Sequence, residues 1–391
     1  MKHDFTKYIN RKDSDSYKWD SEYPNVTYPL GCADSDFESP KEIFDAMNKR
    51  LENHVFGYNG YRVIAGAQAA IKGYYKRRHE MDVELEHIVT TTGLMFALNL
   101  MIRTYSNEGD LVIIQTPVYH NFKKTVEQVG RSVSDNKLVY NRENGTYSVD
   151  FDDLEARASE PRAKILLICN PMNPVGRTFT KDELLRIHEI CTKHDVIVLS
   201  DEVHCDLAYE DNHICYHSIC EEAKNNAIVM NASGKSFNTS SLYGSMLIIP
   251  NRKLRTEFEL ALAATHIDVN EFAIIANTVS YSQCDYYIDG LKEYLLLNKA
   301  YIEDFFAQQL PSVRVIKQNA TYLAWLDFAD WGMTNNELHA FLISNGIGLG
   351  NGAVFGASEG TFMRLNYACH SKTLSAALAH LKQVYTDKIA N

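Results

Sequence analysis

The sequence has no long hydrophobic run and no dense cluster of positive charge. No segment approaches the roughly 18 consecutive apolar residues that a membrane-spanning helix needs, and residues 1–20 contain no apolar stretch suited to a signal peptide. The formal net charge of -11 repels nucleic-acid backbones and anionic lipid surfaces. We therefore expect a protein without nucleic-acid or membrane partners.

The sequence also lacks the close cysteine pairs that zinc sites and disulfide frameworks need. Its eight cysteines are scattered through apolar segments: Cys32, Cys169, Cys191, Cys205, Cys215, Cys220, Cys284 and Cys369. Reduced thiols in the core of a cytoplasmic protein fit this distribution best. We expect a cytoplasmic protein with no metal site.

The chain has 391 residues, more than the roughly 100 to 200 of one ordinary domain, so we expect two domains. An extended arm over 1–40 precedes a large domain over 41–285, in which short apolar runs alternate with helical segments. These runs are IVTTT, LVIIQ, ILLIC, VIVLS, AIVMN and MLIIP. Such alternation predicts an α/β fold with a mostly parallel sheet that helices cover on both faces. Residues 286–391 indicate a smaller α+β domain.

Three of these apolar runs lead directly into polar segments, at ILLICNPMNPVGR, VIVLSDEVHCD and AIVMNASGKSFN. Asn170, Asp201 and Lys235 follow them at spacings of 31 and 34 residues. Because ligands bind beyond the carboxyl ends of the strands in open α/β sheets, we expect a site at this edge. A simple ion pair between Asp201 and Lys235, and a turn at Asn173 between its two prolines, also fit these residues alone.

The strings NPMNPVGR, SDEVH and SGKSFN, in this order and spacing, resemble the aspartate-aminotransferase fold of pyridoxal-phosphate enzymes, fold type I. ADSDF, FGY, ATYLAWLDF and MRLNYACH further resemble its cystathionine β-lyase-like carbon–sulfur lyase branch. The resemblance covers nearly the whole chain. It implies a large domain with a mostly parallel seven-stranded sheet, a pyridoxal 5'-phosphate cofactor, and a homodimer with shared active sites.

The resemblance assigns roles to residues at the strand ends. Lys235 carries the cofactor as a Schiff base and then removes the substrate α-proton, and Asp201 keeps the pyridinium nitrogen protonated. Asn173 contacts the ring hydroxyl oxygen, and Tyr119 stacks on the ring face. His204 is a further cofactor-binding residue. A metal site formed by Glu202, His204 and Asp206 is an alternative interpretation of the SDEVHCD segment.

The cofactor phosphate requires backbone amides and hydroxyl groups. Gly93 and Leu94 open an expected helix directly after a strand, where amides bind anions. The lysine segment departs from its relatives, because Gly234 stands where many of them carry a serine, and we expect Ser233 to substitute. Tyr58 is expected to reach the phosphate across a dimer interface.

For the substrate, Arg364 matches the arginine that binds the α-carboxylate, with Asn173 as a second substrate contact. Gly31 stands where lyase relatives commonly carry tryptophan, and Ser35 replaces a frequent methionine. We expect Gly31 to widen the substrate entrance, although plain divergence is an equal alternative. Tyr243 replaces a basic residue of many aminotransferases, which resembles the lyase branch.

The resemblance implies a carbon–sulfur β-lyase that cleaves cystathionine, cysteine or a related S-conjugate to pyruvate, ammonia and a thiol. The alternative is a class I/II aminotransferase, which shares the opening steps, because cofactor-binding motifs do not separate the two reactions. A third hypothesis is a non-catalytic regulator with the same fold. Lys235, Asp201 and Arg364 argue against it, because a regulator does not need them.

Overall fold

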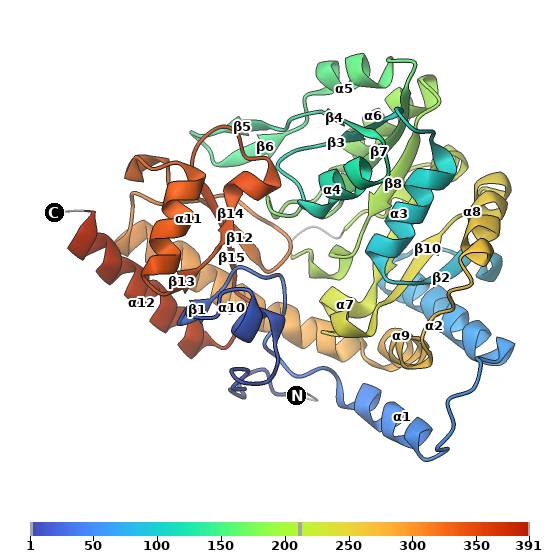
Figure 1. Ribbon diagram of the computed structural model, residues 1–391, viewed down its shortest axis with the longest axis horizontal. Helices are drawn as coiled ribbons and strands as arrows, with labels where there is room; N and C mark the ends of the chain where they lie inside the picture. Colours follow the sequence, from blue (N-terminus) through green and yellow to red (C-terminus); the bar gives the residue numbers. More distant parts are fainter. Residues whose placement is uncertain (1–2, 210–212, 390–391) are drawn as a thin grey trace.

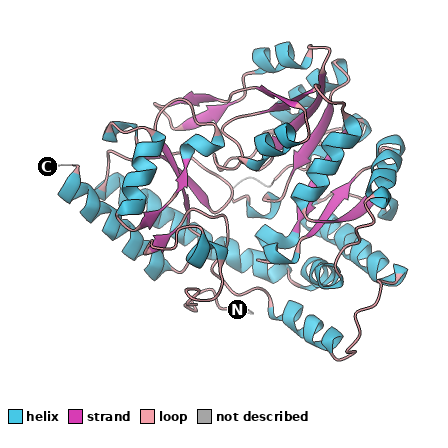
Figure 2. Cartoon of the chain, viewed as in Figure 1, coloured by secondary structure: helices cyan, strands magenta, loops and turns pink. Residues whose placement is uncertain are grey.

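The computed structural model describes residues 3–209 and 213–389, which form two larger sheets with their covering helices and two short strand pairs (Figures 1 and 2). The main sheet has seven strands in the order β2-β10-β9-β8-β7-β3-β4. The pairs from β9 to β4 are parallel, whereas β10 is antiparallel to both of its neighbours. The strands are β2 (Ile88–Thr92), β10 (Gly244–Ile248), β9 (Ala227–Ala232), β8 (Ile197–Asp201), β7 (Ala163–Cys169), β3 (Leu111–Ile114) and β4 (Ser132–Asp135).

The main sheet confirms the predicted fold class and all six predicted strands. The sequence did not predict β4, one of the two edge strands, because its residues SVSD do not form an apolar run. An edge strand has one neighbour and tolerates polar side chains, so hydrophobicity does not always mark it.

Helices cover both faces of the main sheet, which explains why its inner strands are continuously apolar. In β3, Val112 and Ile114 share a hydrophobic cluster with α3 (Leu94–Tyr105), α4 (Asn121–Gln128) and α8 (Arg252–Ala264). The residue between them, Ile113, belongs to the opposite cluster. That cluster includes residues of α1 (Lys41–Leu51), α2 (Tyr61–His79), α5 (Phe151–Ala158), α6 (Lys181–Lys193) and α9 (Glu271–Gln283).

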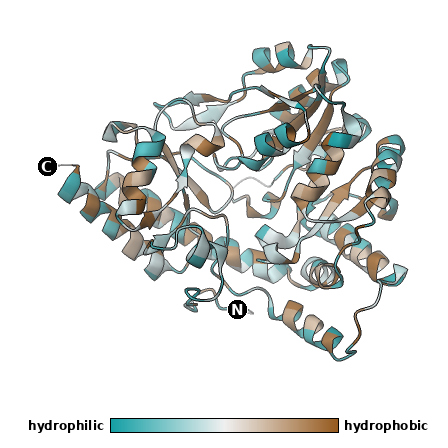
Figure 3. Cartoon of the chain, viewed as in Figure 1, coloured by the Kyte–Doolittle hydropathy of each residue, from teal (hydrophilic) through white to brown (hydrophobic). Residues whose placement is uncertain are grey.

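The hydropathy colouring agrees with this layering. The inner strands of the main sheet are largely brown, whereas the surrounding helices alternate between brown and teal (Figure 3). None of the helices in the described ranges combines the length and apolarity that a membrane crossing requires.

The long helix α10 (Asp285–Gln309) follows α9 and leads to a smaller antiparallel sheet (Figure 1). This sheet has the order β11-β12-β15-β14, formed by β11 (Arg314–Val315), β12 (Leu323–Asp327), β15 (Phe362–Asn366) and β14 (Gly350–Asn351). Helices α11 (Asn335–Ser344) and α12 (Ser371–Lys388) pack beside it. Two short pairs complete the strands: β1 (Tyr28–Pro29) with β13 (Ile347–Gly348), and β5 (Val139–Asn141) with β6 (Thr146–Ser148). The domain boundaries after residues 40 and 285 remain a prediction.

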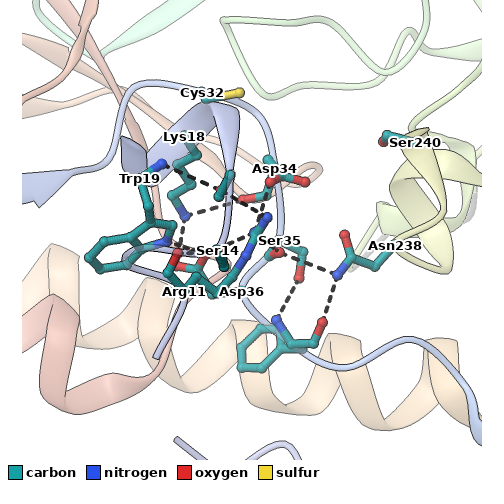
Figure 4. Close-up of polar contacts among 12 residues, drawn as sticks. Arg11, Ser14, Lys18, Trp19, Cys32, Asp34, Ser35, Asp36, Asn238 and Ser240 are labelled. Atoms are coloured by element: carbon teal, nitrogen blue, oxygen red, sulfur yellow. Dashed lines mark hydrogen bonds and ion pairs between the residues drawn. The ribbon is translucent and has the colours of Figure 1, made fainter. Parts of the chain in front are cut away.

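A buried ion cluster fixes the N-terminal arm (Figure 4). The Lys18 ammonium is fully buried and donates to Asp36 Oδ2 at 2.7 Å, while Arg11 donates to Asp34 Oδ2 at 2.8 Å. Trp19 Nε1 also donates to Asp36, at 2.8 Å. Because buried charges need partners at short range, this cluster holds residues 34–36 in one conformation. The preceding residues form a wall of the cavity described next.

Candidate active site

A cavity of about 610 Å³ lies at the carboxyl ends of β8 and β9, where the strand pattern predicts a site. Three parts of the chain that are distant in sequence contribute to its lining. Asp201 comes from the end of β8, Lys235 from the short helix α7 (Ser233–Ser236) after β9, and Arg364 from β15. The arm contributes Cys32.

The Lys235 amine points toward the arm. Its Nζ donates a hydrogen bond to the Ala33 carbonyl oxygen at 2.6 Å, and that oxygen also accepts from the Tyr322 hydroxyl at 3.2 Å. Burial lowers the pKa of Lys235, and the charge of Arg364 lowers it further. Cys32, Asp34 and Asp201 oppose this shift. A lowered pKa raises the fraction of neutral amine, which is the nucleophilic form.

Asp201 is a buried carboxylate without an ion-pair partner among the described residues. Its Oδ1 accepts a hydrogen bond from the Val203 amide at 3.1 Å. Burial raises the pKa of Asp201 to about 7, with a further contribution from Glu202, while the Val203 hydrogen bond and Lys235 oppose the rise. A carboxylate in this position suits a cationic N–H group of a bound ring.

The raised pKa of Asp201 predicts how the stability of the cofactor-free protein depends on pH. Between about pH 4 and about pH 7 the folded protein keeps a proton on Asp201 that the unfolded chain has already released, so the free energy of unfolding falls as pH rises. Asp201→Asn has no such proton. When the pH is raised from about 5 to about 8, we expect the free energy of unfolding, measured with urea, to fall by roughly 1–3 kcal/mol less in this variant than in the wild type. Equal losses in the two proteins would contradict the raised pKa.

Arg364 is buried and held by two neutral oxygens. Its Nη1 donates to Asn173 Oδ1 at 2.8 Å and its Nη2 donates to the Gly31 carbonyl oxygen at 2.8 Å. The guanidinium carbon lies 4.6 Å from the centroid of the Phe355 ring. In the part of the chain that the structure describes, Arg364 Nε is buried without a hydrogen-bond partner and no carboxylate pairs with this cation. A ligand carboxylate would supply the missing anion.

His204 and Tyr119 also line the cavity. Burial, together with the charges of Lys235 and Arg364, lowers the pKa of His204 to about 3, so this imidazole is neutral near pH 7. Its Nδ1 is buried and has no partner in residues 3–209 and 213–389. The Tyr119 hydroxyl accepts a hydrogen bond from Asn121 at 2.7 Å, which leaves the ring free to contact a ligand.

The amino end of α3 faces the same cavity through Gly93 and Leu94. Gly93 has φ of +89°, a conformation that residues with a Cβ rarely adopt, and a Cβ there would lie 3.2 Å from the Tyr243 ring. In the described residues Gly93 makes no side-chain cap hydrogen bond, and the first amides of a helix have no partner within the helix, so this helix end suits a phosphate group. Thr239 and Ser240 add hydroxyl-bearing side chains to the lining.

The prediction for Ser233 does not fit this geometry. Its hydroxyl donates to Asn277 Oδ1 at 2.7 Å and is 2.8 Å from Thr239 Oγ1, and the residue does not line the cavity. Thr239 and Ser240, which do line the cavity, are better candidates than Ser233 for hydroxyl contacts to a phosphate group. Tyr58 does not line the cavity either, and its side chain is completely exposed in the single chain.

The prediction for Gly31 also needs correction. A Cβ at this position would lie 3.0 Å from the Tyr23 ring and 3.3 Å from Glu22 Oε1. These two side chains occupy the space beside Gly31, so the missing side chain does not leave an open entrance.

The alternative metal interpretation of Glu202, His204 and Asp206 is wrong, because the three side chains do not meet in the described structure. The Glu202 carboxylate is hydrogen-bonded to the Ser200 hydroxyl, to the Tyr216 amide and to the His213 imidazole. Asp206 instead accepts hydrogen bonds from a separate set of side chains, Tyr74, Ser236 and His79.

Among the polar groups of the cavity, the sequence did not predict Glu22, the Ala33 carbonyl, Thr239 or Ser240. A backbone carbonyl carries no sequence signal. Glu22 lies in the polar arm, where nothing in the pattern distinguishes a cavity residue from a solvent-exposed one. Thr239 follows the lysine segment closely, and this proximity is the one signal that points to it.

Together these groups fit pyridoxal phosphate. The cavity offers helix-end amides for a phosphate, an amine of lowered pKa for an aldehyde, and a buried carboxylate for a cationic ring nitrogen. The unpartnered Arg364 Nε and His204 Nδ1 leave hydrogen-bonding capacity that a bound cofactor and substrate would use.

Comparisons with known proteins extend this result over the whole chain. The family model for aminotransferase class I and II matches residues 28–381. The sequence is 34% identical over 385 residues to cystathionine beta-lyase PatB of Bacillus subtilis, covering 97% of this chain and 98% of that protein. Identity to Protein MalY of Escherichia coli is 30% over 386 residues, covering 97% of each.

A solved structure gives the same result for the fold. Cystalysin from Treponema denticola, whose crystal structure contains a pyridoxal 5'-phosphate cofactor, is similar with a TM-score of 0.94 at 32% identity. The match covers 99% of this chain and 100% of cystalysin. The predicted fold type is therefore confirmed.

Proposed function

Since the chain belongs to the class I and II aminotransferase family, we propose that it is a pyridoxal-phosphate-dependent carbon–sulfur β-lyase. Its substrates are cystathionine, cysteine or related S-conjugates, which it converts to pyruvate, ammonia and a thiol. The observation that carries the proposal is that one cavity brings together Lys235, Asp201 and Arg364, whose Nε has no hydrogen-bond partner among the described residues. The likeness to PatB over nearly the whole chain supports the lyase reaction.

Bound pyridoxal phosphate supplies an electron sink for the pair left at the α-carbon when its proton departs. Arg364 binds the substrate α-carboxylate through its planar guanidinium and so orients the α-carbon. Lys235 accepts the α-proton on Nζ, for which its lowered pKa and its position in the cavity are suited. Asp201 holds a proton at the ring nitrogen, and Asn173 orients Arg364 through the 2.8 Å hydrogen bond.

The β-carbon–sulfur bond then breaks and the sulfur leaves with the bonding pair as a thiolate. The remaining three-carbon fragment hydrolyses to pyruvate and ammonia, so one water is consumed for each substrate cleaved. An aminotransferase shares the first proton transfer but returns that proton to the cofactor. The family name keeps this alternative open.

We further propose a cytoplasmic homodimer. Tyr58 and Tyr61 are 101% and 94% exposed, and Val55 and Phe56 beside them are 65% and 68% exposed. A contiguous exposed apolar segment of this kind favours a protein interface. In the dimer, Tyr58 of the partner subunit would reach the phosphate end of the cavity. All eight cysteines are free thiols, which fits a reducing compartment.

Product analysis tests the proposed reaction. Protein loaded with pyridoxal phosphate is mixed with cystathionine in one reaction, and with alanine plus a keto acid in another. We expect pyruvate, ammonia and homocysteine in equal amounts from cystathionine alone. Amino-group exchange without thiol or ammonia would contradict the lyase and establish the aminotransferase.

A further inference from the structure

Glu22 is a cavity residue to which the proposed reaction gives no role. Its side chain lines the cavity from the arm, together with Tyr17 and Cys32. Glu22 Oε2 accepts a hydrogen bond from the Cys32 amide at 3.0 Å. Within residues 3–209 and 213–389, Glu22 Oε1 has no hydrogen-bond partner, and no cation pairs with this carboxylate. One carboxylate oxygen therefore remains available to a ligand.

Glu22 and Arg364 bind opposite sides of the same peptide group. Arg364 Nη2 donates to the Gly31 carbonyl at 2.8 Å, and the N–H of the next residue, Cys32, donates to Glu22 at 3.0 Å. The oxygen and nitrogen of one peptide group are only about 2.3 Å apart, so the bonded atoms of these charged groups lie no more than about 8 Å apart. An amino acid with a long side chain spans a distance of this order. A substrate with such a side chain, bound to Arg364 in the cavity that Glu22 also lines, is therefore long enough to reach Glu22.

Gly31 makes room for this arrangement. A Cβ on residue 31 would lie 3.3 Å from Glu22 Oε1 and 3.0 Å from the Tyr23 ring, so a larger side chain would displace both neighbours. Glycine at position 31 therefore allows Glu22 and Tyr23 to keep their positions beside the cavity.

The electrostatics of Glu22 change when a substrate binds. Burial raises the pKa of Glu22, and the attraction of Arg364, followed by the Cys32 hydrogen bond and Lys18, opposes this rise. Asp34 adds to the rise. A substrate carboxylate on Arg364 neutralises the main cation that stabilises ionised Glu22. The half-buried carboxylate would then lose its main counter-charge, unless the substrate supplies one.

We propose that Glu22 determines substrate specificity by selecting thioether amino acids whose sulfur substituent carries a protonated amine. This inference rests on the proposed lyase function and narrows its substrate class. S-aminoalkyl cysteines, and thioethers that join two amino acids, belong to this class. S-alkyl cysteines without a distal charge do not.

Equilibrium binding tests the selection without any turnover. L-Lysine and L-norleucine differ chiefly in the terminal ammonium group, and neither has a leaving group on the β-carbon. We expect the loaded wild-type protein, followed by the change in cofactor absorbance, to bind lysine roughly tenfold more tightly than norleucine. Glu22→Gln should remove this preference while changing norleucine affinity less than about twofold. Glu38→Gln, a change in the arm outside the cavity lining, is the matched control and should keep the preference.

Turnover provides the second readout. S-(2-aminoethyl)cysteine and S-propylcysteine form a pair of similar size that differs in the distal amine. Glu22→Gln should lower kcat/KM for the aminoethyl substrate about tenfold and leave the propyl substrate within about twofold. An equal fall for both substrates would show that Glu22 only holds the Cys32 amide and would overturn the inference, as would a wild-type protein without a preference for lysine. If neither thioether is cleaved but the lysine preference persists, the lyase function fails and the role of Glu22 stands.

Discussion

Lys235→Ala is expected to lower kcat/KM by at least roughly 10³-fold, because we propose that this one side chain both carries the cofactor and moves the α-proton. The amine lies in the cavity lining, and burial lowers its pKa, so its removal takes away the nucleophile and the base together. The measurement is steady-state cleavage of cystathionine. It is combined with borohydride reduction and mass spectrometry of the Lys235 peptide.

The wild-type peptide should gain the mass of the reduced cofactor, and the Lys235→Ala protein should gain none. Lys292→Ala is the matched control, because burial also lowers the pKa of Lys292 but this residue does not line the cavity. Its activity should stay near that of the wild type. Cofactor attached to any other lysine in the wild-type protein would refute the assignment of Lys235.

Arg364→Leu is expected to reduce kcat/KM roughly 10²–10³-fold, mainly through a higher KM. The buried guanidinium has an unpartnered Nε and no carboxylate partner in the described structure, which supports the proposal that the substrate carboxylate is its anion. Arg364→Lys should recover only part of this loss, because an ammonium cannot form the planar paired contact with a carboxylate.

Arg255→Lys is the control for Arg364, since Arg255 is also buried but donates to the carbonyls of Ile249 and Pro250 outside the cavity lining. Its steady-state constants should match those of the wild type. An unchanged KM in Arg364→Leu would mean that another group binds the α-carboxylate.

Much of the fold was predictable because buried strands and helix faces require a recognisable pattern of apolar residues. A strand covered on both faces must be apolar throughout, so β7 with its residues AKILLIC is recognisable without a structure. The edge strand β4, SVSD, carries no such constraint and was missed. The three strand ends lie at one edge as predicted, because parallel strands with helical crossovers all point the same way.

The details of the site depended on contacts between distant residues. Ser233 follows β9, as the pattern requires, but the direction of its hydroxyl is set by Asn277 in α9, 44 residues away. The space beside Gly31 depends on Tyr23 and Glu22, whose positions follow from the fold of the arm. Sequence spacing predicts which segment reaches a site, whereas the rotamer of a single side chain depends on its packed neighbours.

Counting turnovers on cystathionine without any keto acid tests the central claim most directly. A carbon–sulfur lyase regenerates its cofactor in every cycle, so we predict many equivalents of pyruvate, ammonia and homocysteine per subunit. An aminotransferase would stop after about one amino-group transfer per subunit, because its cofactor then holds the amino group until a keto acid accepts it. A reaction that stops at that point and resumes when a keto acid is added would contradict the lyase.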